Sequence, residues 1–215
     1  MDIREILHHV DHTQLKPYAD WESIEKLCDE AIRYQTASVC VPPNYIRRIF
    51  EAYGTDVNIC TVVGFPLGYS VTEAKEAETV AALKDGAAEI DMVINITDLK
   101  NGDTEKIRSE IRALRTLTEG KILKVIVETC YLTEEEKIAM CRTVTEAGAD
   151  YIKTSTGFGT AGAAIEDIRL FKAHIGENVK IKAAGGIRTQ EFMEQLLKAG
   201  ADRLGCSAAV DLVKA

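Results

Sequence analysis

The sequence predicts a (β/α)₈ barrel built as one domain over residues 1–215. Eight short β-branched runs alternate with stretches of helical periodicity, a pattern typical of a parallel sheet wrapped by helices. Neither a linker nor a break in composition divides the chain, and 215 residues at 46% hydrophobic content suffice for one α/β barrel. The alternative is an open doubly wound sheet. It is disfavoured because no G-x-G-x-x-G or P-loop motif follows any predicted strand.

The predicted strands are spaced along the whole chain, and the first and last have the weakest β propensity. They cover residues 9–13, 38–41, 58–63, 89–94, 122–128, 151–154, 180–184 and 203–206.

Helices are expected between these strands because apolar residues recur there at helical spacing, for example Ile107, Ile111 and Leu114. Capping boxes at 70–73 and 133–136 are predicted to start two of them. Helix ends are marked by glycines, namely Gly86, Gly148 and Gly200.

The charge pattern excludes some classes of partner. The chain has 34 acidic and 26 basic residues, a net charge of -8, and no basic cluster typical of a nucleic-acid-binding surface. No stretch approaches the roughly 18 apolar residues of a membrane span, and the first residues lack the apolar segment of a signal peptide. We therefore expect a cytoplasmic protein that binds neither nucleic acid nor membranes.

The six cysteines show no CxxC pair and no zinc-ligand spacing, so reduced thiols in a reducing compartment are expected. His8, His9 and His12 are interpreted as surface or strand-end residues rather than metal ligands, because no acidic or cysteine ligand pattern accompanies them. The sequence thus predicts neither a metal nor an organic cofactor.

Three charged residues interrupt predicted strands and are candidates for catalysis. Asp91, Lys153 and Lys182 lie in the fourth, sixth and seventh strands, whose C-terminal ends face the mouth of a barrel. A single strand lysine more often pairs with a carboxylate, but two on neighbouring strands can lower each other's pKa and leave one amine neutral and nucleophilic near pH 7. Asp91 would pair with a lysine or orient a water for proton transfer. Lys124 lies early in the fifth strand and is expected to support the site, with Glu128 as its partner.

Glycine-containing loops after the last strands predict a phosphate site, because such turns expose backbone N–H groups to anions. Gly185, Gly186 and Arg188 follow the seventh strand, while Gly205 and Ser207 lie at the end of the eighth. Thr156 and Gly157, after the sixth strand, are expected to add a third group of donors.

Taken together, these motifs resemble the deoxyribose-phosphate aldolase family in its short bacterial form. The resemblance spans nearly the whole chain and is carried by DHTQLKP (11–17), SVCVPP (38–43), VVGFPLG (62–68), EIDMVIN (89–95), LKVIVET (123–129), YIKTSTGF (151–158), KAAGGIR (182–188) and RLGCS (203–207). It implies a class I aldolase that reversibly cleaves 2-deoxy-D-ribose 5-phosphate to acetaldehyde and D-glyceraldehyde 3-phosphate, without metal or cofactor. It also implies a homodimer or homotetramer.

The resemblance assigns roles to individual residues. Lys153 matches the Schiff-base lysine, Lys182 the second lysine that lowers its pKa, and Asp91 the aspartate of proton transfer. Cys40 matches a cysteine near the substrate, and Asp11 and Thr13 match residues near the base of the site. The chain departs from many relatives at Ala208, where they have a serine, so weaker phosphate binding is expected.

Two other functions fit parts of the pattern. One is a phosphate-binding barrel isomerase or synthase that uses Asp91 and a lysine as an acid–base pair without an imine. The other is a sugar-phosphate sensor on a barrel scaffold. The pair of lysines on adjacent strands favours the aldolase over both.

Overall fold

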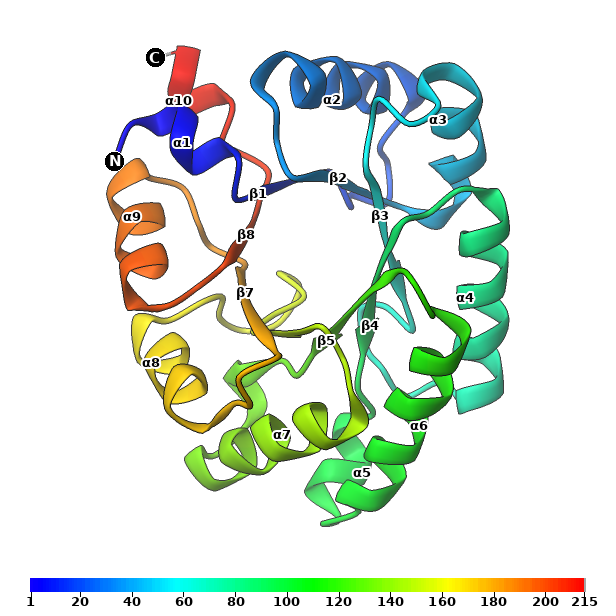
Figure 1. Cartoon of the computed structure of the whole chain (residues 1–215), viewed down its shortest axis with the longest axis vertical. Helices are drawn as coiled ribbons and strands as arrows, with labels where there is room; N and C mark the ends of the chain where they lie inside the picture. Colours follow the sequence, from blue (N-terminus) through cyan, green and yellow to red (C-terminus); the bar gives the residue numbers. More distant parts are fainter. Residues whose placement is uncertain (215) are drawn as a thin grey trace.

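The computed structural model describes residues 1–214 and forms a closed barrel of eight parallel strands inside a ring of helices (Figure 1). The strands are β1 (Val10–Thr13), β2 (Ser38–Val41), β3 (Ile59–Val63), β4 (Glu89–Val93), β5 (Ile122–Ile126), β6 (Tyr151–Lys153), β7 (Lys180–Ala184) and β8 (Arg203–Cys206). They pair in sequence order, and β8 pairs with β1 to close the ring. The predicted fold is confirmed, and the strand predictions differ from the structure only at their ends.

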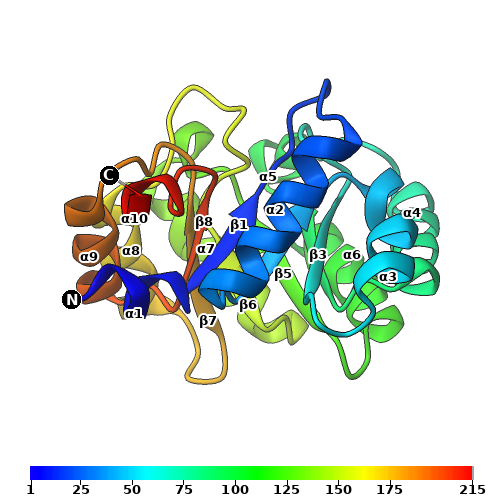
Figure 2. The same ribbon diagram turned by 90° about the horizontal axis from the view of Figure 1, so that it is seen from above.

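The largest end difference is in β5, predicted to run to residue 128. It stops at Ile126, and two residues later Glu128 has φ 56°, a left-handed conformation outside the allowed range of a strand. In Figure 2 the segments after β1 and β6 rise at the same end of the barrel, which is its mouth.

Helices cover the outside of the barrel, and two short 3₁₀ turns lie in its loops. The α-helices are α1 (Ile3–Leu7), α2 (Trp21–Tyr34), α3 (Ile46–Tyr53), α4 (Thr72–Asp85), α5 (Ile96–Lys100), α6 (Thr104–Leu117), α7 (Glu134–Ala147), α8 (Ile165–His174), α9 (Gln190–Ala199) and α10 (Asp211–Lys214), and the turns are η1 (Pro43–Tyr45) and η2 (Thr129–Tyr131). Within residues 1–214, no helix is long and apolar enough to cross a membrane.

The predicted helix signals are confirmed in four of five places. Thr133 and Glu136 form the reciprocal capping box of α7, and Gly86, Gly148 and Gly200 take positive φ at the C-caps of α4, α7 and α9. The box predicted at 70–73 is wrong. There α4 begins at Thr72, so its N-cap is Val71, whose apolar side chain forms no capping hydrogen bond.

Successive side chains of a strand point alternately toward the helices and toward the barrel axis, and the two sets have different surroundings. Outward residues such as Val39, Ile90 and Leu123 belong to the apolar core between strands and helices. Inward residues form no such uniform core. Cys40, Cys60 and Val62 make a small separate cluster on the β2–β3 side, with Leu15 and Phe65 packed against it, whereas charged residues occupy the rest of the barrel axis.

The loop after β3 requires glycine at position 68. Gly68 has φ 73°, and a Cβ there would overlap the carbonyl oxygen of Ile94. Gly120 has the same φ of 73°, but a Cβ there would meet no atom within 4 Å, so it is a matched control.

We expect Gly120→Ala to cost about 1 kcal/mol of unfolding free energy for the left-handed backbone. Gly68→Ala should cost about 1–3 kcal/mol more, because the added methyl group overlaps the backbone of Ile94. Urea unfolding of both variants measures the difference. Equal losses would show that the loop after β3 moves to admit the side chain.

Candidate active site

Asp91 is the centre of a buried charged cluster inside the barrel. Its Oδ2 accepts hydrogen bonds from the Nζ atoms of Lys153 and Lys182, each at 2.7 Å. Its Oδ1 accepts from Lys124 Nζ at 2.8 Å and from Cys60 Sγ at 3.2 Å. Asp91 and Lys182 are fully buried, and Lys153 is only 3% exposed. The three residues predicted to be catalytic are therefore brought into direct contact.

The register of the strands explains why these side chains meet. Asp91 is the pairing partner of Lys124 across β4 and β5, and Lys153 is the partner of Lys182 across β6 and β7. Lys182 is in turn the partner of Arg203 on β8. Inward positions on consecutive strands thus carry the basic groups of the cluster. The three lysines contact Asp91, whereas Arg203 contacts Asp11 and Glu89.

Two further carboxylates, Asp11 and Glu89, complete the cluster. Asp11 Oδ1 accepts from Ser38 Oγ at 2.7 Å and from Arg203 Nη1 at 2.5 Å, and its Oδ2 contacts Lys182 Nζ. Glu89 lies 2.5 Å from Lys124 Nζ and 3.4 Å from Arg203 Nη1. Asp11 therefore lies beside Lys182 inside the barrel.

Opposite charges outweigh burial in setting the pKa values of this cluster. Burial raises the pKa of Asp91, but Lys124, Lys153 and Lys182 hold it well below its ordinary value. Burial lowers the pKa of Lys182, but Asp11 and Asp91 raise it above its ordinary value. Lys182 therefore keeps its charge, because two carboxylates contact it. The expectation that one of the two lysines is neutral stays a prediction.

Lys124 is a full member of the cluster, and its predicted partner was wrong. Its pKa is well above the ordinary value, since Asp91, Cys60, Asp11 and Glu89 outweigh its burial. Glu128 lies beyond the end of β5 and accepts the backbone N–H of Thr156 at 3.2 Å.

Thr156 is held by that carboxylate. Its hydroxyl donates to Glu128 and also accepts the N–H of Phe158 at 3.0 Å. Both donors of Thr156 are therefore used by Glu128, so they tie the loop after β6 to the segment after β5.

The glycine loops after β6 and β7 lie against each other at the mouth. A Cβ on Gly185 would lie 3.4 Å from the Cα of Gly157 and 3.1 Å from that of Gly162. Gly157, Gly185 and Gly186 all have positive φ, between 72° and 88°. Gly157, Gly186, Arg188 and Ser207 are exposed, as expected of groups that meet a ligand from solution.

Gly205 differs from the other predicted phosphate-binding glycines because it lies in a strand rather than in a loop. It lies within β8, where a Cβ would approach Ala184 Cβ to 2.9 Å and Lys182 Cε to 3.3 Å. This glycine leaves room for the side chain of Lys182 to extend along the barrel axis.

Cys40 and Thr13 lie on the neighbouring strands β2 and β1. Cys40 is fully buried and pairs in register with Cys60. Thr13 is half-buried at the end of β1, and its hydroxyl donates to the carbonyl of Asp11 at 2.7 Å. All six cysteines are free thiols.

Two groups of side chains bring metal-ligating atoms within 4.8 Å of one another: Cys40, Cys60 and Asp91, and Asp11, Cys60 and Glu89. Each carboxylate in them already contacts at least one lysine. A cation would have to displace an ammonium group there, so the absence of a metal site remains our prediction.

Of the three histidines, His12 was interpreted wrongly as a surface or strand-end group. It is 3% exposed on the outer side of β1, and its Nε2 lies 2.9 Å from Glu30 Oε2. It therefore faces α2 rather than the interior of the barrel.

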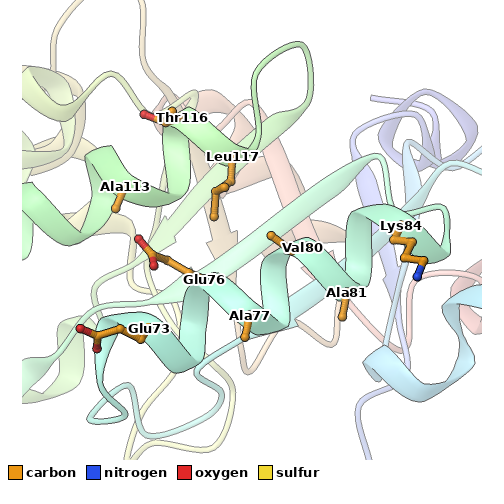
Figure 3. Close-up of a pocket in the computed structure, with 9 residues that line it drawn as sticks. All are labelled: Glu73, Glu76, Ala77, Val80, Ala81, Lys84, Ala113, Thr116 and Leu117. Carbon is orange, nitrogen blue, oxygen red and sulfur yellow. The ribbon is translucent and has the colours of Figure 1, made fainter.

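A groove of about 760 Å³ lies on the outer surface between α4 and α6 (Figure 3). It is lined by apolar residues such as Val80 and Leu117, with Glu73, Glu76 and Lys84 at its edges. None of the residues of the charged cluster lines it, so the groove is separate from the candidate active site.

Residues 4–210 match the DeoC/LacD family of aldolases. The chain belongs to this family. It is 67% identical over 214 residues to a deoxyribose-phosphate aldolase from Clostridium botulinum (strain Alaska E43 / Type E3), covering 100% of this chain and 97% of the relative. It is 51% identical over 212 residues to a deoxyribose-phosphate aldolase from Clostridioides difficile, covering 99% and 97%.

Solved structures of the family have the same fold. A tetrameric deoxyribose phosphate aldolase from Aeropyrum pernix superposes with a TM-score of 0.92 at 29% identity, covering 99% of this chain and 91% of that one. An aldolase named QR15 superposes with a TM-score of 0.93 at 36% identity, covering 98% and 95%.

Three members of the cluster in this DeoC/LacD family chain were not predicted from the sequence: Glu89, Arg203 and Cys60. Glu89 lies two residues before Asp91 on the same strand, so the alternation of a strand puts both on the inward face. The same rule relates Arg203 to Gly205 on β8. No predicted site residue lies on β3, so alternation could not have identified Cys60.

Proposed function

We propose that this protein is a class I aldolase that reversibly cleaves 2-deoxy-D-ribose 5-phosphate to acetaldehyde and D-glyceraldehyde 3-phosphate, in the breakdown of deoxyribose. The observation that carries the proposal is the contact of Lys153, at the C-terminal end of β6, with a carboxylate shared with Lys182. Membership of the aldolase family supports the reaction class.

In this proposal the unprotonated amine of Lys153 attacks C1 of the open-chain sugar, and loss of water leaves an iminium ion. The C2–C3 bond then breaks. Its electron pair forms the C1–C2 double bond of an enamine and neutralises the nitrogen, while the C3 hydroxyl loses its proton and becomes the aldehyde of glyceraldehyde 3-phosphate.

Asp91 is the group placed to manage protons at the amine. Its Oδ2 contacts the reacting nitrogen, and through a water it takes the proton of the C3 hydroxyl. Return of a proton to C2 of the enamine gives the imine of acetaldehyde, and hydrolysis frees Lys153. Lys182, which keeps its charge, favours the ionised form of Asp91 before it takes this proton and after it returns it.

The phosphate is assigned to the glycine loops at the mouth. Backbone N–H groups of Gly157, Gly185, Gly186 and the segment from Gly205 to Ser207, with Arg188, would hold it and orient the sugar. Thr156 serves this site by shaping its loop through Glu128. Ala208 would supply only its backbone N–H, so phosphate affinity is expected to be weaker than with a serine there.

Several remaining features complete the proposal. Residues 1–215 act as one barrel domain in the cytoplasm, with small sugar phosphates and aldehydes as partners and without metal or organic cofactor. Cys40, Thr13 and Asp11 border the substrate. The protein assembles as a homodimer or homotetramer, a proposal supported by the tetrameric relative from Aeropyrum pernix.

Borohydride reduction in the presence of acetaldehyde tests the mechanism. We expect a stable ethyl adduct, mapped by peptide mass to Lys153, because reduction fixes the imine as a secondary amine. The control is the same protein treated with borohydride and ethanol, which has no carbonyl group. Binding of 2-deoxy-D-ribose 5-phosphate without any trapped adduct would instead indicate an acid–base enzyme or a sensor.

A further inference from the structure

We infer that Glu89 and Arg203 are positioning residues that tune the nucleophile Lys153 from the far end of the barrel, and that their opposite charges act in opposite directions. Glu89 acts through Lys124. Arg203 acts through Asp11. The inference rests on the proposed function and adds what sets the pH range in which the enzyme works.

Both residues lie at the end of the barrel opposite the mouth. Glu89 is the first residue of β4 and Arg203 the first of β8, whereas Lys153 is the last residue of β6. Glu89 is 1% exposed, and its carboxylate lies 3.4 Å from the guanidinium group of Arg203. A sugar that enters at the mouth meets Lys153 before it meets either group, so neither is assigned a contact with substrate.

A short path of charged groups connects Glu89 with the reacting amine. Glu89 Oε2 lies 2.5 Å from Lys124 Nζ, and its Oε1 accepts from Asn58 Nδ2 at 2.7 Å. Lys124 Nζ donates to Asp91 Oδ1 at 2.8 Å, while Lys153 Nζ donates to Asp91 Oδ2 at 2.7 Å. Glu89 thus neutralises a lysine that competes with Lys153 for the same carboxylate. Without Glu89, Asp91 would stabilise the protonated form of Lys153 less strongly.

Arg203 acts with the opposite sign. Its Nη1 donates to Asp11 Oδ1 at 2.5 Å, and the second oxygen of Asp11 contacts Lys182 Nζ. Lys182 also donates to Asp91 Oδ2, the oxygen that Lys153 uses. Because Arg203 engages part of the negative charge of Asp11, its loss would leave Lys182 more fully neutralised. Asp91 would then be freer to stabilise a protonated Lys153.

Distance and burial determine the size of the effect. The contacts place both groups roughly 10 Å from the reacting nitrogen, and two unit charges at that separation, with an effective dielectric constant of about 20, change a protonation equilibrium by on the order of one pH unit. The sign distinguishes the two residues. Loss of a negative charge favours the neutral amine, whereas loss of a positive charge favours the protonated amine.

Either residue can be replaced without leaving another charge of the cluster unpaired. Without Glu89, Lys124 still contacts Asp91, and without Arg203, Glu89 still contacts Lys124. Both variants are therefore expected to fold. The other buried titratable side chains of the barrel interior and of the loop after β5 are unchanged in both variants: Asp11, Cys40, Cys60, Asp91, Lys124, Glu128, Tyr151 and Lys182.

The test is the pH dependence of kcat/KM for cleavage of 2-deoxy-D-ribose 5-phosphate, because the acid limb of this profile reports the essential base of the free enzyme. Glu89→Gln should move the midpoint of the acid limb about one unit to lower pH than in the wild type. Arg203→Gln should move it about one unit to higher pH. Titration of the substrate phosphate and of the unchanged side chains is common to all profiles, so it does not contribute to these differences.

A double variant separates the effect of charge from structural damage. Glu89→Gln combined with Arg203→Gln removes one charge of each sign, so the midpoint should return to within about 0.3 pH units of the wild type. Damage to the barrel would instead accumulate in the double variant.

Glu110→Gln is the matched control for loss of a buried carboxylate. Glu110 is 6% exposed and also pairs with a fully buried lysine, since Lys75 Nζ lies 2.8 Å from its Oε1. It lies on α6, outside the barrel. Its replacement should lower the melting temperature and leave the acid limb in place.

Shifts of the two single variants in the same direction, the absence of a shift in either, or a shift for Glu110→Gln equal to that for Glu89→Gln would overturn the inference. Should Glu89→Gln fail to fold, Arg203→Gln and the double variant decide it, because the upward shift of the first must be reversed in the second. Failure of the proposed function looks different, because the wild type would then neither cleave the substrate nor form a borohydride-trapped adduct with acetaldehyde.

Discussion

Replacing Lys153 by leucine is expected to reduce kcat/KM for 2-deoxy-D-ribose 5-phosphate by on the order of 10⁵-fold, the size of loss found when an enzyme loses its covalent nucleophile. Steady-state assay of purified protein measures the change. The substrate should still bind, because the glycine loops are untouched, and no adduct should form on borohydride reduction.

The same variant should unfold at nearly the urea concentration of the wild type. The cluster holds four basic side chains, Lys124, Lys153, Lys182 and Arg203, against three carboxylates, Asp11, Glu89 and Asp91. Removing Lys153 leaves three of each, so every remaining charge keeps a partner. Residual activity within 100-fold of wild type would show that another amine forms the imine, and a stability loss above about 3 kcal/mol would contradict this charge balance.

Replacing Asp91 by asparagine is expected to damage both activity and stability. Activity should fall about 10²- to 10⁴-fold, because the proton-transfer group at the amine is lost. Unfolding free energy should fall by about 3–5 kcal/mol at pH 7, the usual cost of leaving buried charge without its partner. The variant keeps four basic groups but only two carboxylates, whereas Lys153→Leu keeps three of each.

The stability effect of Asp91→Asn should depend on pH in a defined direction. The folded-state pKa of Asp91 is depressed below 3.8, so its contribution is present above that value and is lost only as the pH falls well below it. The pKa of Lys182 is raised above 10.5, so its contribution is present below that value and is lost as the pH rises further.

The difference in unfolding free energy between wild type and Asp91→Asn should therefore be largest from about pH 5 to pH 9, and it should decrease at lower and at higher pH. Urea unfolding at intervals of one pH unit measures it, with Asp20→Asn as a control that also removes one negative charge, but from the exposed N-cap of α2. A constant gap down to pH 2 would show that Asp91 is not the charge that the lysines need.

Much of this architecture could be predicted from the sequence because it depends on local signals. All strands but β8 contain at least one β-branched residue, and Gly86, Gly148 and Gly200 end helices where the chain must adopt positive φ. The convergence of Asp91, Lys153 and Lys182 followed from the rule that parallel strands share one mouth. Those inferences need only strand order.

The remaining features depend on which residues face each other across strands. That Lys124 pairs with Glu89 rather than Glu128 depends on the strand register and on the end of β5 at Ile126. The charge of Lys182 depends on Asp11, which is 171 positions earlier and adjacent only because β8 closes against β1. Periodicity contains no information about such contacts.

The charged cluster also divides the barrel by sign. All three of its carboxylates come from β1 and β4, whereas all four of its basic groups come from β5, β6, β7 and β8. Neither half-barrel can neutralise its own interior, so each would bury like charges if it folded alone. Assembly of the two halves is thus an electrostatic complementation, and it gives this chain a reason to fold in one cooperative step rather than half by half.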